Sequence, residues 1–170
     1  LAVDTAANVD GDLTVKGSAG ANTLASGDGN DTFVMGDITT FTAADAVNGG
    51  AGTDEIRLTA DDSSTGAVVD DLGRAGIEKI TVLASSTVTE DAKITLNYDN
   101  SITDAMEIDA SALTSSSAVF TLAIAGTTTN VAEALTVTGG AGADIIATSD
   151  GADFITGGNG ADTITGDAGA

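Results

Sequence analysis

The sequence predicts an all-β protein built as a parallel β-solenoid, which we expect to be right-handed, and three observations support this. A glycine- and aspartate-rich motif recurs every nine residues near both ends of the 170-residue chain. The 26 acidic residues comprise 21 Asp and 5 Glu, a bias toward the turn-forming acid and away from the helix-forming one. The middle of the chain carries short apolar runs rich in β-branched residues, a pattern typical of strands.

The motif is clearest near the C-terminus, where complete copies begin at Gly139, Thr148 and Gly157. Each copy has Gly at its fourth position, Asp at its sixth and Ile at its eighth. A fourth copy begins at Gly166 and stops at Ala170, before its Asp, so we expect the chain to be a fragment of a longer protein.

The same motif opens the chain, with copies at 17–25, 26–34 and 49–57. The stretch 35–48 is one copy plus an insertion of five. With Val47 at the eighth position, Asp45 falls at the sixth, and the inserted residues should bulge from one turn without breaking the stack. Residues 8–16 form a decayed copy, with Leu13 where Asp is expected.

Each position of the motif has a physical reason. Glycines allow positive φ, so a Gly-rich hexapeptide can turn its carbonyls inward. The last three residues form a short strand whose apolar eighth side chain points into a core. Two copies make one coil, and stacked coils form two parallel sheets. The sixth-position Asp and the turn carbonyls supply the hard oxygen ligands that Ca²⁺ prefers, whereas Mg²⁺ demands stricter octahedral geometry.

The copies that begin at Gly139, Gly157 and Gly49 resemble the nonapeptide of RTX (repeats-in-toxin) proteins, which fold as calcium-binding parallel β-rolls. The resemblance covers roughly a third of the chain. It implies that an ion lies between the turns of two successive coils and is bound by carbonyls and by both sixth-position aspartates. Two departures are Thr148-Ser149 in place of Gly-Gly and Ser26 in place of the first Gly.

Carried over by register, the resemblance assigns three pairs of ligands. One ion is expected at Asp144 and Asp162, with the carbonyls of Gly139, Ala141, Gly158 and Gly160. Asp31 and Asp54 are separated by one coil plus the insertion and should also pair with each other. The ion between them should be bound in addition by the carbonyls of Ser26, Asp28, Gly50 and Gly52. Asn22 and Asp45 should pair more weakly, because Asn brings no charge. From the copy at 148–156 we expect Asp153, with a partner beyond Ala170, and the carbonyls of Thr148 and Asp150. Alternatively, these acids only cap turns or solubilise the surface.

The middle of the chain predicts a wider continuation of the solenoid. A polar loop is expected at 59–66 and a short helix at 68–74, followed by strands at 77–83, 93–98, 105–109, 118–125 and 134–137. With aromatics at 3%, the core should consist of Ala, Val, Ile and Leu. We expect three segments: a repeat block at 1–57, a β-solenoid spacer at 58–138 and a second repeat block at 139–170.

The composition excludes several functions. The absence of His and Cys excludes zinc-finger, Ser-His-Asp and Cys-His chemistry in this segment. A net charge of −21 argues against nucleic-acid binding, and no apolar run approaches a membrane span. We expect no enzymatic activity here. A pair of carboxylates could in principle hydrolyse a glycoside, but with so many Asp residues such a pair arises by chance and is no evidence for an active site.

The function expected from these features is structural. The spacer segments 76–82 and 108–113 are similar to those between RTX blocks in bacterial surface-layer (S-layer) proteins and large adhesins. We expect an exported, cell-surface segment that stays unfolded in the cytosol and passes a type I secretion channel. Outside the cell it should fold on calcium and self-associate into a lattice. The alternatives are the stalk of an RTX adhesin, or the secretion and folding tail of an RTX protease or lipase.

Overall fold

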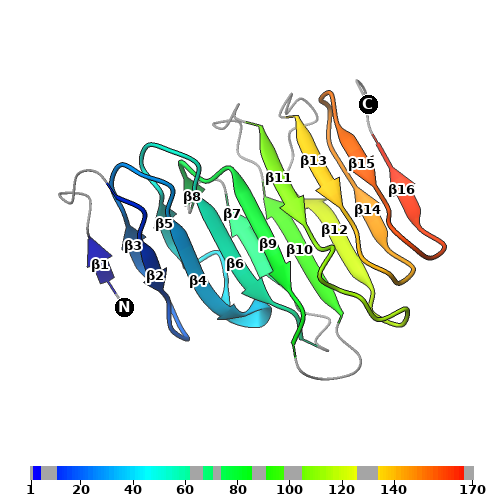
Figure 1. Ribbon diagram of the computed structural model, residues 1–170, viewed down its shortest axis with the longest axis horizontal. Coiled ribbons are helices and arrows are strands. Elements are labelled where there is room, and N and C mark those ends of the chain that lie inside the picture. The colour runs from blue at the N-terminus through cyan, green and yellow to red at the C-terminus, as the bar shows by residue number, and fades with distance from the viewer. Residues whose placement is uncertain are drawn as a thin grey trace.

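The computed structural model describes residues 2–4, 11–61, 67–70, 74–85, 91–97, 105–125 and 134–166, and these form a parallel β-solenoid (Figure 1). Every pair of neighbouring strands among them runs parallel, which confirms the predicted fold class. The described residues contain no α-helix and one 3₁₀ helix, η1 (Ile38–Thr40). None of their helices is long and apolar enough to cross a membrane.

One face of the solenoid is a single sheet that runs from one repeat block through the spacer to the other. Its seven strands lie in the order β2 (Thr14–Lys16), β4 (Thr32–Asp37), β6 (Glu55–Thr59), β9 (Lys79–Leu83), β11 (Met106–Asp109), β13 (Leu135–Thr138) and β15 (Phe154–Thr156). This sheet fixes the register that places turns from different coils over one another.

The opposite face is divided into two sheets. The first comprises β1 (Ala2–Asp4), β3 (Thr23–Ala25), β5 (Ala46–Asn48) and β8 (Arg74–Ala75). The second comprises β7 (Ala67–Asp70), β10 (Ala92–Asn97), β12 (Phe120–Ala125), β14 (Ile145–Ala147) and β16 (Thr163–Thr165). The helix predicted at 68–74 is wrong: 68–70 belong to β7 and Arg74 begins β8, because pairing with β10 and β5 outweighs the local helical pattern, and 71–73 lie outside the described residues. Most of the predicted polar loop lies outside the described residues.

The pairing register confirms the nonapeptide arithmetic. Thr14 pairs with Thr32 and Ile145 with Thr163, so each of these strands pairs with the one that lies two copies further along the chain. Thr32 pairs with Glu55, which lies two copies and the insertion further along, so the coil with the insertion keeps its place in the stack.

The insertion packs against the core and does not merely bulge outward. A register shift between Val34 and Gly36 lengthens β4, which runs into η1. The side chains of Ile38 and Phe41 are almost fully buried there. Burying two large apolar side chains favours folding and fixes the inserted residues in one conformation.

The predicted spacer strands are confirmed, since β9 to β13 lie within a residue or two of the expected ranges. Lys79 pairs with Glu107, and Met106 with Leu135, so each spacer coil is longer than a coil of two nonapeptide copies. Each spacer coil contains two strands. The predicted apolar runs at 77–83, 93–98, 105–109, 118–125 and 134–137 therefore follow one another at about half the length of a coil.

The core contains aromatic side chains in addition to the predicted Ala, Val, Ile and Leu. Ile and Leu side chains dominate it, but Phe33, Phe41 and Phe120 are also buried at 0–2% exposure. At the C-terminal end, Phe154 is 68% exposed and Ile164 is 47% exposed. The repeat block at 139–170 therefore buries less apolar surface per coil than the spacer, and hydrophobic burial stabilises it less.

Candidate calcium sites

The strand register extends the sixth position of the motif through the whole stack. We use "sixth position" for the residue directly before the strand residue that aligns, through strand pairing, with Thr32 on the seven-stranded face. On the opposite face the reference residues are Thr23 and Ile145. Along the seven-stranded sheet these residues are Leu13, Asp31, Asp54, Glu78, Met106, Leu135 and Asp153. Along the other face the described examples include Asn22, Asp45, Phe120, Asp144 and Asp162. Acidic residues therefore stack on one another only in parts of the solenoid.

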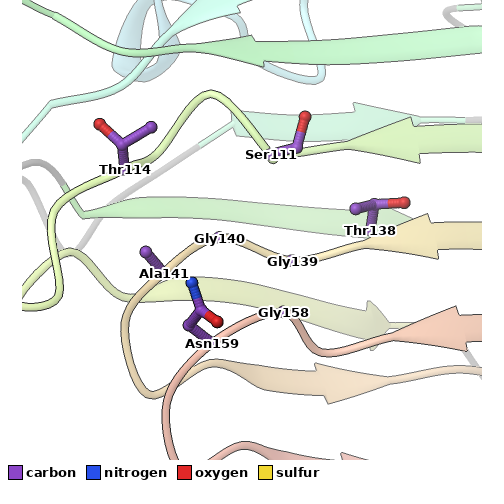
Figure 2. Close-up of a pocket in the computed structure, with 8 residues that line it drawn as sticks. All are labelled: Ser111, Thr114, Thr138, Gly139, Gly140, Ala141, Gly158 and Asn159. Carbon is purple, nitrogen blue, oxygen red and sulfur yellow. The ribbon is translucent and has the colours of Figure 1, made fainter.

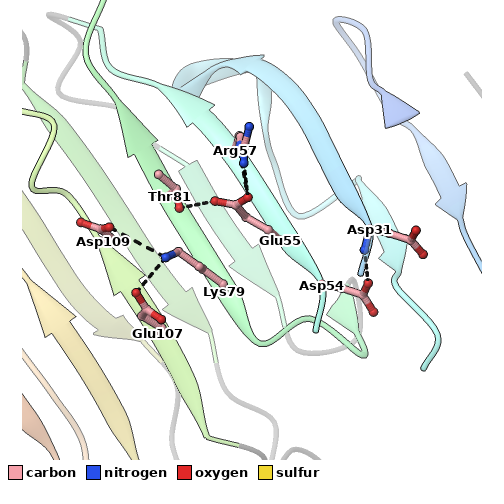
Figure 3. A network of polar contacts seen from close by, with 8 residues as sticks. All are labelled: Asp31, Asp54, Glu55, Arg57, Lys79, Thr81, Glu107 and Asp109. Carbon is pink, nitrogen blue, oxygen red and sulfur yellow. Dashed lines mark hydrogen bonds and ion pairs between the residues drawn. The ribbon is translucent and has the colours of Figure 1, made fainter. Parts of the chain in front are cut away.

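In the N-terminal block the structure brings Asp31 and Asp54 together. Oδ1 of Asp54 accepts a hydrogen bond from the backbone N–H of Asp31 at 2.7 Å (Figure 3). Oδ1 of Asp31 accepts one in turn from the backbone N–H of Leu13 at 2.8 Å. Each carboxylate thus reaches back to the preceding coil.

The C-terminal block repeats this arrangement. Oδ1 of Asp162 accepts from the backbone N–H of Asp144 at 3.0 Å, and Oδ1 of Asp144 accepts from that of Phe120 at 2.9 Å. Oδ2 of Asp144 accepts from the N–H of Gly140 at 2.6 Å. At the opposite edge, Oδ1 of Asp153 accepts from the N–H of Leu135 at 2.9 Å. The predicted pairing by register is therefore present in both blocks.

The second carboxylate oxygens point to an ion. Asp31 and Asp54 are 1% and 0% exposed, and Oδ2 of each is buried without a hydrogen-bond partner; Oδ2 of Asp153 and Oγ1 of Thr148 are likewise unpartnered. A buried anionic oxygen without a partner is costly and calls for an explanation. A bound cation would satisfy these oxygens, so the residues fit calcium.

Side chains alone do not build a metal cage, since no three His, Cys, Asp or Glu side chains in the described part of the chain are placed to hold one ion together. Turn carbonyls must therefore supply the other ligands. The predicted donors Gly50, Gly52, Gly158 and Gly160 all have positive φ. A Cβ on Gly52 or Gly160 would lie 2.0 Å from the carbonyl oxygen of Gly29 or Gly142 of the neighbouring coil, so only glycine permits this stacking.

Two of the predicted N-terminal donor residues make hydrogen bonds to neighbouring coils. The hydroxyl of Ser26 donates to the carbonyl of Gly49 at 2.5 Å. The carbonyl of Asp28 accepts from the N–H of Gly11 at 3.3 Å. The first of these bonds runs to the following coil and the second to the preceding coil.

The other predicted C-terminal donors line a surface pocket. Gly139, Ala141 and Gly158 lie along it, together with Gly140, Ser111, Thr114, Thr138 and Asn159 (Figure 2). Here the repeat turns stack on a spacer turn, and the carbonyl of Leu113 accepts from the N–H of Ala141 at 2.8 Å. The turn with Thr148 and Asp150 lies at the opposite edge, before β15.

Asn22 and Asp45 also come together, but they satisfy each other directly. Nδ2 of Asn22 donates to Oδ1 of Asp45 and to the carbonyls of Ser18 and Gly20, each at 2.7 Å. Oδ2 of Asp45 accepts from the N–H of Thr42 at 2.8 Å. The N–H₂ group of Asn22 thus contacts one carboxylate oxygen and two backbone carbonyl oxygens, the same types of oxygen that bind calcium.

The electrostatics of the acidic pairs favour a positive ligand. Burial raises the pKa of Asp54, and the neighbouring charges of Asp31 and Glu78 add to this effect. Burial also raises the pKa of Asp144, with a further contribution from the charge of Asp162. A cation between the turns would oppose both effects, because it stabilises the ionised form.

Sequence reasoning missed Glu78 as a sixth-position residue. Its Oε2 accepts from the backbone N–H of Asp54 at 2.8 Å. The nine-residue period fails before Glu78, so only the strand register identifies its place.

Comparison with known families agrees with this geometry. Residues 10–37 and 138–170 match the family model of the RTX calcium-binding nonapeptide repeat (4 copies). The copy at 49–57 lies outside these ranges, although its strand stacks in register with the first block. No curated protein and no solved structure matches the chain. Repeats of this family bind calcium and are typical of exported proteins, and the two matched segments of the chain are similar to them.

Proposed function

We propose that the chain is a structural segment of an exported bacterial surface protein that folds and assembles on extracellular calcium, as an S-layer subunit does. One observation carries this proposal. Sixth-position carboxylates stack across coils in both repeat blocks, and those of Asp31 and Asp54 are buried with oxygens that no protein group satisfies.

The proposed ligands follow from the stacking. In the C-terminal block, Asp144 and Asp162 would hold an ion with the carbonyls of Gly139, Ala141, Gly158 and Gly160. In the N-terminal block, Asp31 and Asp54 would do so with the carbonyls of Ser26, Asp28, Gly50 and Gly52. When bound, the ion supplies positive charge and accepts six to eight oxygen ligands. We place no ion at Asn22 and Asp45, since their polar groups already satisfy one another.

The residues of the chain make folding depend on this ion. Stacking the turns brings carboxylates together and buries them, at a net charge of −21. Ligands that bind only the folded state add their binding free energy to its stability. In the cytosol, where free calcium is scarce, the repeat blocks would stay open and suit passage through a secretion channel.

The spacer supports a structural role over a catalytic one. It continues the seven-stranded sheet between the repeat blocks and so extends the sheet faces available for lateral contact. An adhesin stalk and a protease or lipase tail remain the competing roles, and assembly behaviour separates them.

Two measurements on the same preparation test the proposal. Circular dichroism should show β structure in millimolar calcium and its loss after EGTA, with magnesium unable to restore it. Light scattering and electron microscopy in calcium should show ordered sheets. An EGTA-insensitive spectrum would refute calcium-dependent folding, whereas folded, monodisperse monomers in calcium would favour the stalk or tail over the lattice.

A further inference from the structure

We infer that Glu78 completes an additional calcium site, between the repeat turn at 49–54 and the short spacer turn at 76–78. The inference rests on the proposed function, because it uses the same ion and the same stacking of turns. It extends calcium binding one coil beyond the last nonapeptide copy of the N-terminal block.

The register places Glu78 where a repeat would place Asp. Lys79 pairs with Glu55, so Glu78 is the sixth-position neighbour of Asp54. Oε2 of Glu78 accepts from the backbone N–H of Asp54 at 2.8 Å. The equivalent contact in the C-terminal block, from the N–H of Asp144 to Oδ1 of Asp162, measures 3.0 Å.

The oxygen atoms beside Gly49 have the same arrangement as those beside Gly139 in the C-terminal block. A Cβ on Gly49 would lie 2.1 Å from the carbonyl oxygen of Gly76 and 2.3 Å from Oδ2 of Asp54. A Cβ on Gly139 would lie 2.2 Å from the carbonyl oxygen of Gly157 and 2.5 Å from Oδ2 of Asp144. In both places a carboxylate oxygen and a carbonyl from the following turn approach the same point, and glycine leaves room for them.

The burial of the Asp54 carboxylate indicates that a ligand is required on this side of the turn. Asp54 is 0% exposed, and its Oδ2 is buried without a hydrogen-bond partner. The nearby basic side chains pair elsewhere: Arg57 with Glu55 at 2.7 Å, and Lys79 with Glu107 at 2.8 Å (Figure 3). Neither of these cations neutralises Asp54 or Glu78.

The shorter turn explains why the acid is Glu. The N–H of Gly49 donates to the carbonyl of Ala75, so Gly76 lies opposite Gly49 and only Ile77 and Glu78 complete the turn before β9. The turn at 49–54 has six residues for the same span. A three-residue turn offers fewer carbonyls, and the extra methylene of Glu lets the carboxylate reach back. Calcium accepts a bidentate Glu and completes its shell with water, so we expect a weaker site than at Asp144 and Asp162.

The test is a calcium count on the whole chain by equilibrium dialysis, combined with hydrogen exchange at graded calcium. Glu78→Gln keeps an acceptor for the N–H of Asp54 but removes the charge. It should bind one calcium fewer, and residues 49–54 should need at least about tenfold more calcium for protection. Residues 139–165 should be unchanged. Glu107→Gln, on the neighbouring strand, makes the same charge change and should leave the count unchanged.

The outcomes separate this inference from the proposed function. An unchanged count and unchanged protection in Glu78→Gln would overturn the Glu78 site alone. A wild-type chain that binds no calcium would overturn the proposed function itself, and Asp162→Asn gives a positive control for losing an ion. If Glu78→Gln does not fold in saturating calcium, Glu78→Asp decides: a weakened ion at 49–54 supports the site, and an unchanged one refutes it.

Discussion

At the sixth position, the type of side chain decides how each turn is closed. Asp31, Asp54 and Asp144 direct a carboxylate to the preceding coil and leave a negative charge between the turns. Met106 and Leu135 occupy the same place in spacer coils, where they are 2% and 1% exposed. An apolar side chain thus joins coils through the core, whereas an acidic one joins them only with a counter-charge.

Asn22 shows a third way to close a turn, and this gives a prediction. Replacing Asn22 with Asp removes the N–H₂ group and leaves a carboxylate facing Oδ1 of Asp45 and the carbonyls of Ser18 and Gly20. We expect the variant to be less stable than the wild type in EGTA, because like charges repel. In calcium it should bind one more ion and recover its stability.

Thermal unfolding in EGTA and in calcium, with a calcium count, measures this effect. Asn30→Asp is the matched control, since Asn30 is exposed and its Oδ1, an oxygen that Asp retains, accepts from the N–H of Thr53. The control should change neither the count nor the calcium dependence. If Asn22→Asp behaves like Asn30→Asp, the amide does not stand in for an ion.

At the scale of strands and turns, the sequence predicted what depends on periodicity. Period nine gave the coils of the repeat blocks, and apolar alternation gave β9 to β13. Residues whose roles arise from pairing between distant coils could not be predicted this way. Three features depend on neighbours that lie a whole coil away along the chain. They are the strands β7 and β8, the burial of Ile38 and Phe41, and the place of Glu78. The amide contacts of Asn22 are hidden for the same reason.

The spacer coils should owe their stability to the core, which leads to a second prediction. Ile80 in β9 is 0% exposed, so Ile80→Ala should lower the free energy of unfolding by about 2–5 kcal/mol. Leu83 ends the same strand at 36% exposure, and Leu83→Ala should cost less than about 1 kcal/mol. Urea unfolding in saturating calcium gives both values. Equal losses would mean that β9 is not anchored by its inward face.

At the scale of the whole molecule, net charge and pH act through the buried acids. The pKa values of Asp54 and Asp144 are raised, chiefly by burial, in the metal-free fold. A raised folded-state pKa means that these groups cost stability at neutral pH, and that this cost falls as pH drops through the raised pKa toward the ordinary value. Calcium binds the ionised form, so protons compete with it at a higher pH than for an ordinary Asp.

We therefore expect the stabilisation by calcium to shrink as pH is lowered from about 7 toward about 4.5. The difference in melting temperature between calcium and EGTA, measured across this range, gives the effect. Asp54→Asn combined with Asp144→Asn should reduce both the difference and its pH dependence. A calcium effect that stays constant down to about pH 4.5 would contradict the coupling.

The division of one face into two sheets has a mechanical consequence. The seven-stranded sheet is continuous along the whole stack, whereas the opposite face is interrupted between β8 and β7 (Figure 1). Next to this interruption β5 and β8 share two paired residues, while β6 and β9 share five. Hydrogen bonds between strands resist bending along the continuous sheet. Where the opposite sheets are not hydrogen-bonded to each other, the solenoid should bend most easily, with the continuous sheet acting as the hinge. We therefore expect bending of the solenoid to concentrate beside Glu78, where the N-terminal repeat block meets the spacer.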